Sequence, residues 1–533
     1  MNKRTIKNTI ILFKGYPYKD SESVMRQRVP LIPLSLISLA ATLRDAGYSI
    51  RIIDQRDSVE SIYLSLNRQW DKVLCVGISA LTGNEISEGI EFAKRIKRNH
   101  ATIPIVWGGW HVSALPDESI RCDEVDIVVR GLGQCSFLEL VRRISRNEPL
   151  TGIDNILYKS EKGIVKAPIS AYPLLERCSL PAFDLIDLEY YREHSLKLRY
   201  KPVINGIPIT GHLYYVSSFG CPHECSYCCS NSVFGKRMYS YGTQGAVNQI
   251  RWLVEEKKFN SMSFVDANFF VNMQRVEDFC KALVASGVRF AWDAQMHIRD
   301  VIRYEQHGLW DLIKKSGCYR VSIGSESGAQ DILDYIRKRV QVDDILRTAE
   351  IINAHGLIAA FNFLFCLPKV EKLSHVYESI DLARRLKEIN PDFLLAISFY
   401  VPFPGTSMYD DAVGAGLSVP NTLQSWGEFN TNYAHASNSY PWKSPKMERL
   451  IYNVLTFFIP LAIPGNMYRG TLRLVREKMK SSKMRLFFWI GHRLAKMRLN
   501  HSCYRFPFEI WIFNYYRFVR GIPPYVPGGK GVA

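Results

Sequence analysis

The sequence lacks any apolar run long enough to cross a membrane. The two longest, Leu31–Leu43 and Leu455–Gly465, are interrupted by proline. Both are shorter than the roughly 18 residues that a spanning helix needs. The apolar run that follows the basic N-terminus, Thr9–Phe13, is also too short for a secretory signal. We therefore expect a cytoplasmic protein.

Cysteine is also scarce, with 12 in 533 residues, which excludes a disulfide scaffold. Eight of these cysteines are scattered along the chain without a pattern. The other four fall between Cys221 and Cys229. Clustered cysteines in a cytosolic protein indicate metal or redox chemistry.

Acidic residues are few in the C-terminal region. Residues 441–533 contain 17 Lys/Arg and 3 Asp/Glu, so they carry most of the net charge of +17. Aromatic residues are interleaved with these charges: Phe487, Phe488, Trp489, Trp511, Tyr515 and Tyr516. Such a region can bind an anionic membrane surface or nucleic acid. We rank nucleic acid lower, because no recognition fold is visible. The alternative is a helical subdomain with packed aromatics and solvated charges.

Residues 8–145 alternate short apolar runs with amphipathic segments. The runs are Thr9–Phe13, Ser49–Asp54, Lys72–Ile78, Ile103–Trp107 and Ile127–Val129. This alternation predicts an α/β domain, a Rossmann-like doubly wound parallel sheet. Such sheets bind ligands beyond the carboxyl ends of their strands.

A second alternating stretch covers residues 211–410. Its expected strands are His212–Ser217, Ser261–Asp266, Phe290–Met296, Arg320–Gly324, Ala359–Phe365 and Phe393–Phe399. Six βα units predict a partial (β/α)6 barrel of the TIM type, with functional residues at the carboxyl ends of the strands. We therefore expect four parts: residues 1–150, a linker at 151–205, the barrel at 206–410, and a mainly helical region at 411–533.

Three cysteines after the first barrel strand form the strongest motif. Cys221, Cys225 and Cys228 are spaced Cys-x-x-x-Cys-x-x-Cys. Thiolates favour zinc or iron–sulfur clusters, and three of them leave one iron of a cubane cluster open. The alternative is structural zinc with Cys229 as fourth ligand, which the adjacency of Cys228 and Cys229 makes awkward.

With Tyr227 before the last cysteine, this motif resembles that of the radical S-adenosylmethionine (SAM) superfamily. The resemblance implies a 4Fe-4S cluster held by the three cysteines. It also implies SAM bound at the open iron and cleaved by one electron to a 5′-deoxyadenosyl radical, which abstracts a hydrogen atom from the substrate.

Further residues match the family in chain order. The resemblance implies cofactor contacts at Tyr227 in the motif itself, at Asp266 and Asn268 after the second barrel strand, at Ser325 and Glu326 after the fourth, and at Pro404 after the sixth. The fifth strand departs from the pattern, because Cys366 stands where related proteins often have glycine.

The strand ends of the first domain are rich in glycine. Candidate cofactor-binding residues there are Ser79, Gly108, Gly109, His111 and Gly131. Glycine lets a large planar ligand approach the backbone. No Gly-x-Gly-x-x-Gly follows the first strand, which argues against a nicotinamide cofactor.

This region resembles the cobalamin-binding domain of the cobalamin-dependent radical SAM subfamily. Gln134 replaces the usual Glu, and the Asp-x-His-x-x-Gly motif for an axial histidine is missing. The alternative is a Rossmann-like domain used only for packing, in which His111 is structural.

The subfamily resemblance implies methyl transfer from methylcobalamin to an unactivated carbon. We expect a small-molecule or lipid-like substrate, the latter because of the basic, aromatic C-terminal region. The resemblance also implies an electron donor, either a reductase or a flavodoxin or ferredoxin. One rival is radical cyclisation or rearrangement without methyl transfer, since the motifs fit equally well the branch that contains the anaerobic Mg-protoporphyrin monomethyl ester cyclase. A rival of another class is a non-catalytic cobalamin-binding protein. No motif identifies the catalytic residues on the substrate side.

Overall fold

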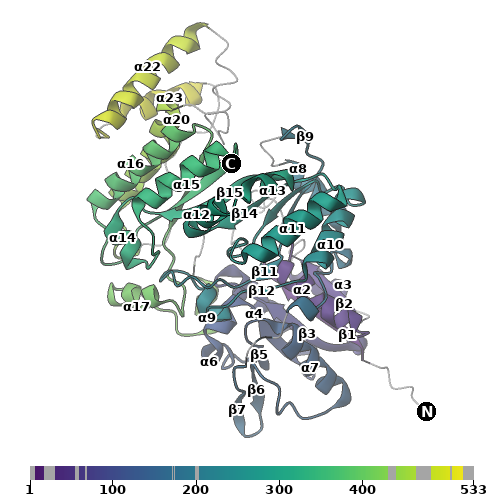
Figure 1. Cartoon of the computed structure of the whole chain (residues 1–533). Helices are drawn as coiled ribbons and strands as arrows, with labels where there is room; N and C mark the ends of the chain where they lie inside the picture. Colours follow the sequence, from purple (N-terminus) through teal and green to yellow (C-terminus); the bar gives the residue numbers. More distant parts are fainter. Residues whose placement is uncertain are drawn as a thin grey trace, which may run out of the picture.

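The computed structural model describes residues 7–16, 31–54, 59–66, 69–170, 172, 175–197, 203–429, 440–463, 482–504 and 507–519. Within them the chain forms two large sheets and a helical C-terminal region (Figure 1). The first sheet lies at one end of the molecule, the second in the middle, and the last two helices at the other end.

The first sheet has the strand order β2-β1-β3-β4-β5-β6-β7. Its strands are β1 (Thr9–Lys14), β2 (Ser49–Asp54), β3 (Val73–Ser79), β4 (Ile105–Gly108), β5 (Ile127–Val129), β6 (Ile156–Ser160) and β7 (Gly163–Lys166). The first five are parallel, as the alternating pattern predicts. Separate apolar cores lie on its two faces, one with helix α4 (Asn84–Asn99) and the other with α2 (Leu34–Asp45) and α7 (Gly133–Arg146).

Strands β6 and β7 were not expected from the sequence. They form an antiparallel hairpin inside residues 151–205, and β6 pairs with β5. All four residues of β7 are exposed, so it is an edge strand without a hydrophobic signal of its own. The sheet is therefore mixed rather than wholly parallel.

The second sheet is parallel throughout, with the strand order β10-β13-β14-β15-β16-β17. These strands are β10 (His212–Tyr215), β13 (Ser261–Phe264), β14 (Ala291–Met296), β15 (Cys318–Glu326), β16 (Ile358–Phe365) and β17 (Leu394–Phe399). The helices that connect them are α10 (Thr243–Glu255), α11 (Met273–Ser286), α12 (Ile298–Gln306), α13 (Trp310–Lys315), α14 (Gln330–Tyr335), α15 (Val342–Ala354) and α16 (Leu373–Ile389). This arrangement confirms the predicted partial barrel.

The described residues beyond the barrel are mainly helical, as expected. The helices described there are α17 (Ser407–Gly414), α18 (Leu423–Gly427), α19 (Pro445–Tyr452), η4 (Asn453–Phe458), α20 (Ile459–Ala462), α22 (Ser482–Asn500) and α23 (Phe508–Val519). Helix α18 returns to the first domain, where Trp426 is fully buried in the core beside α4. Buried residues of the later helices join the barrel core instead. None of the described helices combines the length and hydropathy needed to cross a bilayer.

Candidate active site

The three predicted metal-binding cysteines lie on one loop at the carboxyl end of β10. The loop follows β11 (Ser218–Phe219) and ends in helix α9 (Ser230–Phe234). Its middle is fixed from two sides, because the Ser226 amide donates to the Ile336 carbonyl at 2.9 Å and the Met408 amide donates to the Ser226 carbonyl at 3.2 Å. Two segments distant in sequence, one in the barrel and one just after it, therefore hold the loop in place.

The three thiols influence one another electrostatically. Burial is the main cause that raises the pKa of each, to about 12 for Cys221. Neighbouring cysteines add to the rise at Cys221 and Cys228, and Glu326 adds to it at Cys225. Among the described residues, no three Cys, His, Asp or Glu side chains are arranged around a single metal ion. In a cubane cluster each thiolate binds a different iron, so the sulfurs need not meet at one point. A polynuclear iron centre with positive charge fits this donor set, because it would offset the cost of burying three thiolates.

Tyr227, within this loop, contacts Glu326 at the end of β15. The Tyr227 hydroxyl donates to Glu326 Oε1 at 2.7 Å, and Lys338 Nζ donates to the same oxygen at 2.9 Å. Burial opposes the charge on Lys338, but the Glu326 carboxylate and the nearby thiols raise its pKa overall. Glu326 has φ +60, a left-handed conformation that is costly for a residue with a side chain. Two predicted residues thus form one buried polar unit with a cation that the sequence did not single out.

Asp266 lies beneath the cysteine loop and is fully buried. Its carboxylate accepts from the Ser217 amide at 2.8 Å and from the hydroxyls of Ser217 and Ser218 at 2.6 and 2.5 Å. Burial raises its pKa, and Arg275, 3.9 Å away, opposes that rise. In this structure Asp266 fixes the segment that leads into the cysteines.

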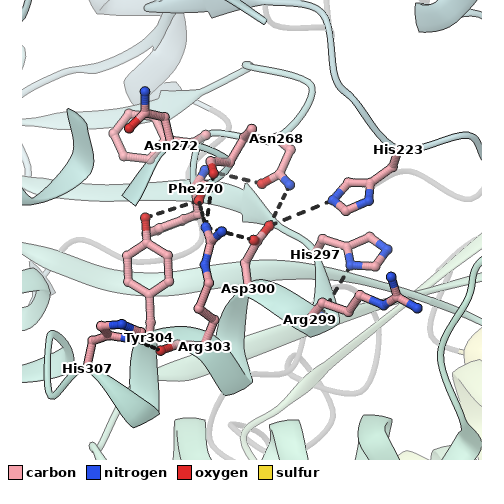
Figure 2. A network of polar contacts seen from close by, with 12 residues as sticks. His223, Asn268, Phe270, Asn272, His297, Arg299, Asp300, Arg303, Tyr304 and His307 are labelled. Carbon is pink, nitrogen blue, oxygen red and sulfur yellow. Dashed lines mark hydrogen bonds and ion pairs between the residues drawn. The ribbon is translucent and has the colours of Figure 1, made fainter. Parts of the chain in front are cut away.

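Asn268 belongs to a polar network that Figure 2 shows. Its Nδ2 donates to Asp300 Oδ2 at 2.7 Å, and the same oxygen lies 3.9 Å from His223 Nε2. The His223 ring stacks on His297 with centroids 3.8 Å apart. His223 lies within the cysteine motif and His297 directly follows β14, so Asn268 reaches the cysteine loop through Asp300.

Ser325 and Pro404 have different surroundings. The Ser325 hydroxyl is fully buried and donates to the Asn362 carbonyl on β16 at 2.7 Å. Pro404 is buried in a turn, and the next residue, Gly405, faces Ser232 of α9 and Ala114. The turn therefore meets both the end of the cysteine loop and the first domain.

The predicted loop after β4 depends on glycine at one position. Gly109 has φ +99, and a Cβ there would lie 2.7 Å from the Ala80 carbonyl oxygen. At Gly108 a Cβ would meet only the Val129 carbonyl oxygen, at 3.7 Å. Ser79 ends β3 beside this loop and shares a 3.1 Å hydrogen bond with Ser35. Gly109 is thus required by the backbone conformation and its close neighbours, whereas Gly108 leaves open the space that a side chain would fill.

The side chain of His111 is buried, with 1% of its surface exposed. Its Nδ1 lies 2.9 Å from the Thr82 hydroxyl, and its ring is 5.3 Å from that of Trp426. Its Nε2 has no hydrogen-bond partner among the described residues. Burial lowers the pKa of His111 to about 4, so the ring is neutral at ordinary pH.

Gly131 is covered by Tyr172. It has φ +65, and a Cβ would overlap the Tyr172 ring. The Gly131 amide donates to Ser113 Oγ at 2.9 Å, and the Tyr172 hydroxyl donates to the Val233 carbonyl at 2.8 Å. The glycine therefore accommodates a tyrosine that connects the first domain to α9.

The loops of both domains meet at α9. Helix α5 (Trp110–Ala114), which begins just after Gly109, packs against α9, and Trp110 contacts Phe234 edge-on with ring centroids 5.1 Å apart. Because α9 directly follows Cys229, the predicted glycine loop and the predicted cluster loop lie next to each other. Such a contact can bring two cofactors to one substrate.

Several residues of this region were missed from the sequence. His297 immediately follows an expected strand, and His223 lies inside the cysteine motif, so both positions carried a usable signal. Lys338 and Tyr172 carried none, because the burial of one and the contacts of the other arise from tertiary packing.

Comparisons with known families agree with both domains. Residues 28–141 match the family described as "B12 binding domain". Residues 215–383 match the family described as "Radical SAM superfamily". B12 is cobalamin, so the two matches name the cofactors expected at the glycine loops and the cysteine loop.

Three relatives span much of the chain. An uncharacterized methyltransferase of Pyrococcus horikoshii is 26% identical and covers 75% of this chain and 82% of its own. An anaerobic magnesium-protoporphyrin IX monomethyl ester cyclase of Rubrivivax gelatinosus is 23% identical, over 63% of this chain and 58% of its own length. A hopanoid C-3 methylase of Methylococcus capsulatus is 24% identical, over 71% of this chain and 68% of its own length.

Two solved structures share the fold. TsrM from Kitasatospora setae, a radical SAM methyltransferase solved with cobalamin and a [4Fe-4S] cluster, matches with a TM-score of 0.59 and 17% identity over 78% of this chain and 76% of its own. OxsB, solved with aqua-cobalamin and SAM, matches with a TM-score of 0.63 and 14% identity over 98% of this chain and 77% of its own. With both family matches on the corresponding domains, the chain belongs to the cobalamin-dependent radical SAM enzymes, which use a 4Fe-4S cluster, SAM and cobalamin.

Proposed function

We propose that this enzyme transfers a methyl group to an unactivated carbon of its substrate. One observation supports this proposal above the others: helix α5 of the cobalamin-binding domain packs on α9, which directly follows the cysteine loop. A methyl donor and a radical generator must act on the same carbon, so their sites must be adjacent.

We propose that Cys221, Cys225 and Cys228 hold the cluster, and that the loops at Ser79 and Gly108 face the cobalamin. Gly131, predicted with them, is covered by Tyr172 and has no place in this proposal. When bound, the cluster and SAM supply a radical at the substrate carbon, and cobalamin supplies the methyl group. The protein's own contribution is positioning and exclusion of water.

Specific side chains serve these two roles. Lys338 places one positive charge beside the thiolates and orients the Glu326 carboxylate, and Tyr227 donates to the same carboxylate oxygen. Trp110 and Phe234 close the contact between the domains with apolar surface, which limits access of water to a reactive carbon radical.

The substrate class we propose is a small molecule or a lipid-like compound. A relative named as a hopanoid methylase acts on a lipid, and the basic, aromatic C-terminal region would suit such a substrate. We place the enzyme in the cytoplasm, where a reductase, flavodoxin or ferredoxin would deliver the electron.

Cyclisation without methyl transfer is the second candidate, and one observation favours it. A relative named as an anaerobic cyclase is 21% identical over 81% of this chain and 82% of its own length. The fold accommodates either reaction.

Product mass separates the two candidates. The anaerobically reconstituted enzyme, with SAM, cobalamin and a reductant, is incubated with a lipid extract and a metabolite extract. Methylation predicts a product heavier than its precursor by one methylene unit, with deuterium incorporated from methyl-labelled SAM. An unlabelled product that has lost two hydrogens would instead establish cyclisation.

A further inference from the structure

The last two described helices expose large apolar side chains on the molecular surface. On α22, Trp489, Ile490 and Met497 are 53%, 45% and 52% exposed. On α23, Phe508, Trp511 and Ile512 are 41%, 64% and 47% exposed. The spacing within each helix places these residues on one side of it. We call these six residues the apolar face.

The opposite sides of the same helices are packed. Ala495, Leu499 and Ile510 are buried in the barrel core. Arg498 and Glu509 form a bidentate ion pair at 2.6 and 2.9 Å, with both side chains 6% exposed. This pair fastens α22 to α23, so the apolar face is held outward by a fixed framework.

Positive charge accompanies the apolar face. Glu509 is the one acidic residue in the sequence from 482 to 519, and Arg498 already neutralises it. Arg493 lies over the Trp489 ring at 4.5 Å, and Lys496 is exposed one turn further along. Cations beside partly exposed tryptophans are typical of helices that lie in the interface of a membrane.

The two helices also occupy a position in the molecule that a flat surface can reach. They lie at the end of the molecule away from the cobalamin-binding domain (Figure 1). A flat surface could cover them without touching the contact between α5 and α9.

We infer that the apolar face, with Arg493 and Lys496, binds the surface of an anionic lipid bilayer. Charge alone would also suit nucleic acid, but the exposed aliphatic side chains Ile490, Met497 and Ile512 have no partner on a phosphate backbone. In a bilayer they reach the acyl region while the cations meet anionic headgroups. The inference is independent of whether the reaction is methyl transfer.

Vesicle co-sedimentation of the full chain tests this inference. Vesicles of phosphatidylcholine are compared with vesicles that contain 30% phosphatidylglycerol, at low and at high salt. We expect binding only to the anionic vesicles, weakened by salt. Arg493→Gln/Lys496→Gln should weaken it about tenfold or more, since each cation near such a surface adds about 1 kcal/mol. Trp511→Ser/Ile512→Ser should weaken it at both salt concentrations.

Matched variants and a direct probe make the test selective. Lys162→Gln/Lys315→Gln removes two exposed cations elsewhere, and Leu64→Ser/Ile169→Ser removes two exposed apolar side chains; neither should change binding. Lipids brominated in the acyl chains should quench tryptophan fluorescence, and less so in a Trp489→Phe/Trp511→Phe variant.

Several outcomes would overturn the inference. These are equal binding to neutral vesicles, equal loss in the matched controls, or no quenching by brominated lipid. Binding that short duplex DNA abolishes, without quenching, would assign the surface to nucleic acid. Concentration-dependent dimerisation that Trp511→Ser/Ile512→Ser abolishes, without lipid binding, would assign it to a second copy of the chain.

Discussion

At the scale of single residues, His111 shows how burial decides a role that the sequence leaves open. A histidine after a glycine-rich strand end could be a ligand or a structural residue. The structure buries its ring between Thr82 and Trp426 and leaves Nε2 without a partner in the described part of the chain. A ring that stays neutral in the fold but takes up a proton when unfolded must make stability depend on pH.

The sign of that dependence follows from the lowered pKa. Because His111 has a pKa of about 4 in the fold and about 6.5 when unfolded, the unfolded state binds the extra proton as pH falls. Stability contributed by the neutral ring should therefore fall by about 2 kcal/mol between pH 7 and pH 5. Denaturant unfolding at both pH values measures it, with His111→Gln as the reference that lacks this proton. Parallel losses in the two proteins would show that His111 is not the group responsible.

Cys366 illustrates a departure that the structure explains in part. The sequence has cysteine where related proteins often have glycine, and the backbone there has φ +61, which glycine adopts without strain. The Cys366 amide donates to Glu371 Oε2 at 2.5 Å and its carbonyl accepts from Trp442 Nε1 at 2.9 Å. Main-chain bonds on both sides thus hold the conformation, which nothing in the local sequence reveals.

At the scale of elements, two adjacent glycines in the loop after β4, which sequence reasoning could not tell apart, have different roles in the structure. Both were expected to leave room for a ligand. Gly109 is required by its own backbone, whereas a side chain at Gly108 meets no close neighbour.

Substitutions in this loop should therefore have different effects. Gly108→Val should fold with wild-type stability yet lose cobalamin, because the side chain enters the space in which we place the ligand. Gly109→Ala should destabilise the first domain by about 1–3 kcal/mol, because of its left-handed backbone and the Ala80 carbonyl. Circular dichroism and the absorbance of retained hydroxocobalamin report the two properties separately. Normal cobalamin binding by Gly108→Val would remove this loop from the site.

Most elements could be predicted because burial leaves a clear pattern. The strands of both sheets are apolar runs between amphipathic helices, and β2 and β5 match their predicted bounds. The β6–β7 hairpin was missed since β7 is exposed throughout, although Glu161-Lys162-Gly163 is a plausible turn. The packing of Trp426 in the core of the first domain could not be predicted, because a contact between distant segments leaves no periodic pattern in the local sequence.

The predicted site residues show the same limit. The cysteine spacing predicted the loop, and strand-end positions pointed to Glu326 and Asn268, whose roles at a cofactor stay predictions. Sequence could not show that the Asp266 carboxylate is occupied by Ser217 and Ser218, or that Ser325 bonds to the Asn362 carbonyl. These contacts leave the direct cofactor roles of Asp266 and Ser325 as proposals.

At the scale of the whole molecule, the two sheet domains meet at one place, which we propose as the reaction centre. The two sheets present their loop ends to each other through α5 and α9, and Tyr172 spans the contact from Gly131 to Val233. The C-terminal helices lie at the far end (Figure 1). We therefore predict that the cysteine loop generates the radical whatever the substrate proves to be.

The most direct test of that claim compares single cysteine variants after anaerobic purification and cluster reconstitution. Iron content and 5′-deoxyadenosine formed from SAM with a strong reductant are measured in each protein. We expect Cys225→Ala to lose most of the iron–sulfur absorbance and to form no 5′-deoxyadenosine above background, whereas Cys229→Ala, the adjacent control, retains both. Wild-type formation of 5′-deoxyadenosine by Cys225→Ala, or its loss in Cys229→Ala alone, would contradict the assignment.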